Sequence, residues 1–175
     1  MKAHVQTNKC RRIQAFTIVE LLVVIVVIAI LAAITIVAFN GIQQRARDQR
    51  MVSAASQVYK AISLYVTDKG AYPTASISCV GIGYPVDAAG LCYSGRSNLE
   101  ANTNLSTYIS SMPSPPMEQL SFSARGMLIN TTATPKVLEY TIIGGSTCPS
   151  IGAPQSTTSV DTNGDLWCRA ILPSL

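Results

Sequence analysis

One apolar block near the start of the chain constrains the fold more than any other feature. It runs over 24 residues, from Phe16 to Phe39, and only Thr17, Glu20 and Thr35 within it are not apolar. A strand covers about 4–8 residues, whereas this block is long enough to cross a lipid bilayer. Because a lone segment in hydrocarbon must satisfy its own backbone hydrogen bonds, the block is predicted to be a membrane-spanning α-helix.

The net charge of +4 belongs to the first 15 residues. Four of the thirteen Lys and Arg residues lie there without any acid, which leaves nine basic against nine acidic residues in the rest of the chain. The basic start is expected to stay in the cytoplasm while the remainder emerges outside. Arg45, Arg47 and Arg50, just after the block, weaken that asymmetry. The balanced remainder shows no basic track for nucleic acid.

A cleaved signal peptide is the alternative to a membrane anchor. Against it, the apolar stretch is longer than the usual core of about 7–15 residues, and no clear cleavage site follows. Cys10 precedes the block, which excludes a lipoprotein. Glu20 has two interpretations: an intramembrane acid that works with a partner, or an acid that the helix dipole favours near a helix start.

Type IV pilins and their pseudopilin relatives have a processing site that residues 15–23, AFTIVELLV, resemble. In this family prepilin peptidase removes a short basic leader before a Phe or Met. The new N-terminus is methylated, and a glutamate five residues into the mature chain serves filament assembly. The resemblance implies a cut between Ala15 and Phe16, methylation of Phe16, and a contact between Glu20 and the Phe16 ammonium of a neighbouring subunit. Ala15 stands where the family usually has Gly.

The pattern becomes amphipathic after Gly41. Apolar side chains then recur at spacings of three and four residues, at Met51, Ala55, Val58, Ile62 and Tyr65. Polar residues alternate with them on the opposite face, at Gln49, Ser53, Gln57, Lys60 and Ser63. This is the pattern of a helix lying on a core. Gly70 supplies a C-cap, so one helix is predicted over residues 18–68.

The rest of the chain is predicted to form a small head. Residues 99–109 have the pattern of a short helix, residues 126–132 and 136–143 that of an antiparallel hairpin, and residues 166–172 that of a third strand. A long helix packed on a small antiparallel sheet is an economical α+β fold, and it matches the pilin fold that the resemblance implies. The expected organisation is a cleaved basic leader (1–15), a transmembrane and filament-core helix (16–39), the amphipathic half of the same helix (40–70) and the globular head (71–175).

Loss of the leader removes Cys10 and leaves Cys79, Cys92, Cys148 and Cys168. An even number of cysteines in an exported chain predicts two disulfides, with three possible pairings. Proximity in sequence favours Cys79–Cys92 and Cys148–Cys168, and buried free thiols are the alternative. Zinc is less favoured, since no two cysteines have the close spacing of a zinc site and the mature chain has no histidine.

Neither a catalytic site nor a cofactor is predicted. His4 is the only histidine and lies in the leader, so Ser-His-Asp, Cys-His and His-metal chemistry are unavailable. Asp161, Asn163 and Asp165 have the spacing of a calcium loop, but the turn glycine and the closing glutamate are absent. A surface turn is the favoured interpretation, with calcium as a weak alternative.

The predicted function is structural, not enzymatic: a subunit of a type IV pilus-like filament. The resemblance implies prepilin peptidase, a membrane assembly platform, copies of the same chain and other pilins as partners. It implies a single-pass chain with a cytoplasmic N-terminus that later enters an extracellular filament. Two alternatives remain: a pseudopilin of a type II secretion or DNA-uptake machine, and a membrane-anchored extracellular binding domain that does not polymerise.

Overall fold

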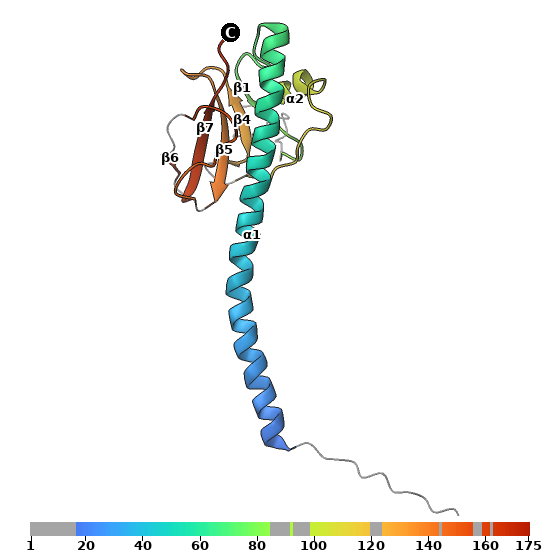
Figure 1. Ribbon diagram of the computed structural model, residues 1–175, viewed down its shortest axis with the longest axis vertical. Coiled ribbons are helices and arrows are strands. Elements are labelled where there is room, and N and C mark those ends of the chain that lie inside the picture. Colours follow the sequence, from blue (N-terminus) through green and yellow to red (C-terminus); the bar gives the residue numbers. More distant parts are fainter. Residues whose placement is uncertain are drawn as a thin grey trace, which may run out of the picture. The chain divides into compact units, whose positions relative to one another are not determined.

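The computed structural model describes residues 17–84, 92, 99–119, 124–143, 145–155, 159–161 and 163–175. The chain divides into two compact units, the first ending at Gly41 and the second running from Ile42 to Leu175. Helix α1, Ile18–Lys69, begins in the first unit and supplies the first element of the second (Figure 1). The predicted helix over residues 18–68 is therefore confirmed, and it ends one residue later.

The described part of the first unit has an apolar and exposed surface. The large apolar side chains described between Ile18 and Phe39 are 47% to 86% exposed. By length and composition this helix is long and apolar enough to cross a membrane. An apolar surface of this extent needs lipid or other apolar helices around it.

In the second unit, α1 buries the face that its periodicity predicts. Met51, Ala55, Val58 and Ile62 are at most 2% exposed, whereas Tyr65 is half-buried. The helix ends at the expected glycine: Gly70 has a φ of +60°, and its N–H donates to the Val66 carbonyl oxygen at 2.9 Å. That geometry is a C-cap, which a residue with a Cβ adopts at a cost.

Five strands form one antiparallel sheet, in the order β1-β4-β5-β7-β6. The strands are β1 (Ile77–Cys79), β4 (Met127–Asn130), β5 (Val137–Ile143), β6 (Ser159–Val160) and β7 (Asp165–Ile171). A separate hairpin joins β2 (Glu118–Gln119) to β3 (Ala124–Arg125). The buried side chains of α1 and of the central strands belong to one hydrophobic core, and Figure 1 shows α1 lying along the sheet. The α+β fold with a pilin-like arrangement is confirmed.

The predicted hairpin and third strand are confirmed as β4, β5 and β7. Tyr140 of β5 pairs with Met127 of β4 on one side and with Cys168 of β7 on the other. The predicted helix over residues 99–109 is wrong at its end, because α2 covers only Glu100–Leu105. The chain turns there, since the Tyr108 N–H donates to the Leu105 carbonyl oxygen at 2.9 Å and its ring packs edge-on against Tyr65 at 5.3 Å.

Two ion pairs between strands accompany the core of the head. Arg125 makes two hydrogen bonds to the Asp165 carboxylate, from Nε at 2.7 Å and from Nη2 at 3.1 Å. Arg169 Nε donates to Glu139 Oε1 at 3.1 Å. Both acids are almost fully buried, so their arginines satisfy carboxylates that would be costly to bury alone.

Candidate functional site

The side chains of Thr17 and Glu20 together cap the N-terminus of α1. The Thr17 N–H and its hydroxyl each donate to Glu20 Oε2 at 2.8 Å. In return, the Glu20 N–H donates to Thr17 Oγ1 at 3.2 Å. This is a capping box, which satisfies two backbone N–H groups that have no partner inside the helix. Thr17 was not predicted as a site residue, although its spacing of three residues from a glutamate is the known signal for this motif.

The geometry bears on both interpretations of Glu20. The capping box shows that Glu20 does serve the helix start of its own chain. Both of its side-chain bonds use Oε2, and among the described residues no basic group pairs with this carboxylate. The carboxylate is exposed at the head of an apolar surface, where it can still accept a cation from another molecule. The predicted cleavage and methylation positions, Ala15 and Phe16, lie outside the described residues.

A second polar arrangement holds α1 to the sheet at the start of the second unit. Gln44 Nε2 donates to the Ile143 carbonyl oxygen at 2.6 Å, and the Ile143 N–H donates to Asp48 Oδ1 at 2.9 Å. Two side chains one helical turn apart thus take both backbone groups of the last residue of β5. Burial raises the pKa of Asp48, although the bond from Ile143 opposes that shift. The sequence alone does not predict that Gln44 and Asp48 contact the sheet, because each has the pattern of an ordinary polar position on a helix.

Both predicted disulfides are present in the head. Cys79 of β1 joins Cys92 with a Cα–Cα distance of 6.4 Å, and Cys148 joins Cys168 of β7 at 5.6 Å. The pairs are those that proximity in sequence favours. Each closes a short loop, which stabilises the fold by about 3 kcal/mol in the chain-entropy model.

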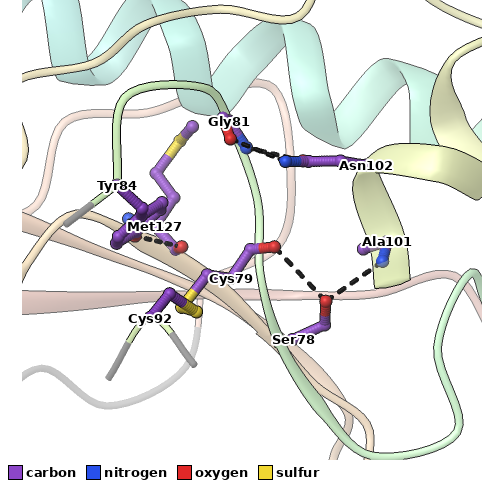
Figure 2. The surroundings of a disulfide bond; sticks show 8 residues. All are labelled: Ser78, Cys79, Gly81, Tyr84, Cys92, Ala101, Asn102 and Met127. Carbon is purple, nitrogen blue, oxygen red and sulfur yellow. Dashed lines mark hydrogen bonds between the residues drawn. A yellow bond between two sulfur atoms is a disulfide. The ribbon is translucent and has the colours of Figure 1, made fainter. Parts of the chain in front are cut away.

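The Cys79–Cys92 bridge lies in a region that hydrogen bonds also fix to α2 (Figure 2). Ser78 Oγ accepts the Ala101 N–H at 3.0 Å. The Asn102 side chain bonds both backbone groups of Gly81, accepting its N–H at 2.8 Å and donating to its carbonyl oxygen at 2.7 Å. The Tyr84 hydroxyl bonds the backbone N–H and carbonyl oxygen of Met127, and that carbonyl oxygen also accepts the Val80 N–H at 3.1 Å. The described residues from Ser78 to Tyr84 are therefore held at several points, not by the disulfide alone.

The calcium candidates lie in one turn whose contacts are internal. Asp161 Oδ1 accepts the N–H groups of Asn163 at 2.8 Å and of Asp165 at 3.0 Å. Burial acts to raise the pKa of Asp161, but these bonds outweigh it and hold the pKa below its ordinary value. The Asp165 carboxylate forms an ion pair with Arg125, which lies outside this turn. Among the described residues, no group of three or more His, Cys, Asp or Glu side chains is placed to hold a metal.

The exposed apolar helix and the α+β head together resemble the fold of a pilin. Comparison with known families agrees, because residues 10–36 match the prokaryotic N-terminal methylation motif. This match and the similarities below confirm the resemblance to type IV pilins and pseudopilins.

Two relatives make the similarity more specific. The chain is 32% identical to the type II secretion system core protein G of Escherichia coli (strain K12) over 103 residues, which cover 59% of this chain and 66% of that protein. It is 36% identical to the protein of the same name from Aeromonas hydrophila over 64 residues, covering 37% of this chain and 45% of that protein. The matches therefore span less than two thirds of either relative. No solved structure matches the chain.

Proposed function

We propose that this chain is a structural subunit of a pilin-type filament, made as a membrane-anchored precursor. One observation carries the proposal: the first part of α1, an exposed apolar surface with a single carboxylate in its first turn, lies within the N-terminal methylation motif. Prepilin peptidase would cut between Ala15 and Phe16, and Phe16 would then be methylated. Residues 16–39 would serve first as the membrane span and then as the filament core.

Assembly needs a contact that fixes the register of otherwise featureless apolar helices. We assign this role to Glu20, whose carboxylate would pair with the Phe16 ammonium of a neighbouring subunit. A charge-assisted contact of this kind gains strength in a surrounding of low dielectric constant. The Thr17 capping box holds the carboxylate in place before the partner arrives. A buried polar pair is also the best-attested device for setting helix register.

Two forms of filament are open to such a subunit. The relatives favour a pseudopilus, because both are named as core proteins of a type II secretion system. The two disulfides fit either form, because the bacterial periplasm and the cell surface are both oxidising surroundings in which such bonds persist. In either form the partners would be copies of this chain, other pilins, the peptidase and a membrane assembly platform.

The experiment replaces Glu20 by Ala in cells that express the full chain. Mature protein is recovered from membranes and from sheared filaments, and its N-terminal residue is identified by mass spectrometry. We expect a methylated Phe16 in the parent protein, and a loss of at least tenfold in assembled material for Glu20→Ala with unchanged membrane content. Thr35→Ala is the matched control, because Thr35 is polar, lies in the same apolar block and bonds only the Ala32 carbonyl oxygen at 2.9 Å among the described residues.

Two outcomes would contradict the proposal. A mature chain that still begins at Met1 would exclude the processing pathway, and normal assembly of Glu20→Ala would leave a simple membrane anchor as the better interpretation. Electron microscopy of the cell surface then separates the two filaments. Long surface fibres indicate a pilus, whereas their absence, with secretion depending on the protein, indicates a pseudopilus.

A further inference from the structure

Three arginines follow the apolar block at a short distance in sequence. Arg45 comes six residues after Phe39, and Arg50 eleven residues after it. Arg45, Arg47 and Arg50 are all exposed in the second unit. Since an α-helix turns once in about 3.6 residues, Arg47 and Arg50, three residues apart, share one side of α1, whereas Arg45 lies on the opposite side. They therefore present positive charge on two opposite sides of the helix.

These arginines have no acidic partner among the described residues. The acids with described side chains in the head each have a partner elsewhere: Asp68 with Lys69, Glu100 with Thr74, Glu139 with Arg169, Asp161 with the Asn163 and Asp165 N–H groups, and Asp165 with Arg125. Asp48 accepts the Ile143 N–H. The described surface thus offers no cluster of unoccupied carboxylates with which another copy of the chain could match three guanidinium groups.

The same arginines oppose the expected membrane topology. Lys and Arg near a span favour the cytoplasmic side, so three arginines on the exported side weaken the orientation signal of the leader. A guanidinium group binds phosphate through two parallel hydrogen bonds and is weakly hydrated. Long basic side chains beside an apolar segment also reach naturally to the membrane interface.

We propose that Arg45, Arg47 and Arg50 bind the phosphate groups of anionic phospholipids while the chain resides in the membrane before assembly. This inference rests on the membrane-anchored precursor of the proposed function, and it adds the class of lipid that the subunit prefers. Each basic residue near an anionic surface strengthens binding by about fivefold, so three together give about 100-fold. Leaving the membrane for a filament would require release of these lipids.

The test uses the full chain, purified in a mild detergent and incubated with equal amounts of phosphatidylglycerol and phosphatidylcholine. Native mass spectrometry then counts the lipids that remain bound. We expect the parent chain to retain phosphatidylglycerol in preference to phosphatidylcholine. The variant with Arg45→Gln, Arg47→Gln and Arg50→Gln should lose that preference, with an affinity for phosphatidylglycerol lower by about 100-fold.

A control variant removes the same amount of charge elsewhere in the head, through Lys60→Gln, Lys69→Gln and Lys136→Gln. It should keep the preference, whereas an equal loss in both variants would show that net charge alone binds the lipid and would overturn the proposal. Unchanged urea unfolding, followed by the fluorescence of Trp167, shows that either variant is folded.

Three further results would also overturn the proposal. Equal retention of both lipids by the parent chain would do so, and so would displacement of the lipid by inorganic phosphate at millimolar concentration, which would identify free phosphate as the ligand. In the third, the arginine variant keeps its lipid but fails to assemble, which would assign the arginines to a second copy of the chain. Processing at Phe16 and the effect of Glu20→Ala are measured separately, so failure of this inference and failure of the proposed function are distinguishable.

Discussion

The contact between Asp48 and Ile143 allows a quantitative test of how α1 is held to the sheet. In Asp48→Ala the Ile143 N–H loses its acceptor at 2.9 Å. An unsatisfied backbone group in a partly buried position costs about 1–3 kcal/mol. Asp48→Asn keeps an oxygen in the same place and removes the charge from this half-buried position. We therefore expect Asp48→Ala to be less stable than the parent by about 2 kcal/mol and Asp48→Asn to differ from it by less than about 1 kcal/mol.

The pH dependence provides a second and independent readout. Burial raises the pKa of Asp48 above 3.8 in the folded chain, with the neighbouring Asp165 charge acting in the same direction. The folded state therefore binds a proton over a range where the unfolded state has lost it. The contribution of this group to stability falls as the pH rises through that range. Asp48→Asn should remove this fall, so the variant should gain stability relative to the parent between about pH 4 and neutral pH.

The assay is urea unfolding of the full chain in detergent micelles, with the disulfides intact. Trp167 is the only tryptophan and lies in β7, so its fluorescence reports on the sheet. A loss of about 2 kcal/mol lowers the urea midpoint by about 1 M for an ordinary dependence on denaturant. The reasoning is refuted if Asp48→Asn is destabilised as much as Asp48→Ala, or if neither variant differs from the parent.

Two further predictions concern the helix and the second disulfide. Gly41→Ala should slow amide hydrogen exchange at residues 42–45, because Ala favours a helix by about 1 kcal/mol and its Cβ would meet no atom within 4 Å; unchanged or faster exchange would contradict this. Joint replacement of Cys148 and Cys168 by Ala should lower the free energy of unfolding by about 3 kcal/mol. Urea unfolding at Trp167 measures the loss, and an unchanged midpoint would show that the bridge adds no stability.

The elements that the sequence predicts well are those with long periodic patterns. The apolar block and the stripe from Met51 to Ile62 predict α1 almost to the residue, because many positions repeat the same signal. The strands β5 and β7 are seven residues each and were expected. The strands β1, β2, β3 and β6 have two or three residues, too few for any period, and they were not expected. Helix α2 was predicted too long because the contacts of Tyr108 with Tyr65 and Asp68 end it.

The residues of the candidate site also fall into two groups: those that the sequence predicts and those whose contacts only the structure shows. The sequence by itself determines the apolar helix, its lone acid Glu20 and the four cysteines of the mature chain, because these depend on residue type and spacing along one segment. Only the tertiary structure decides that Gln44 and Asp48 meet Ile143, and that Asp165 turns to Arg125. Those contacts join residues 40 to 99 positions apart, so they exist only after the helix and the sheet have packed. The helix is thus encoded locally, whereas its attachment to the head is a product of the fold.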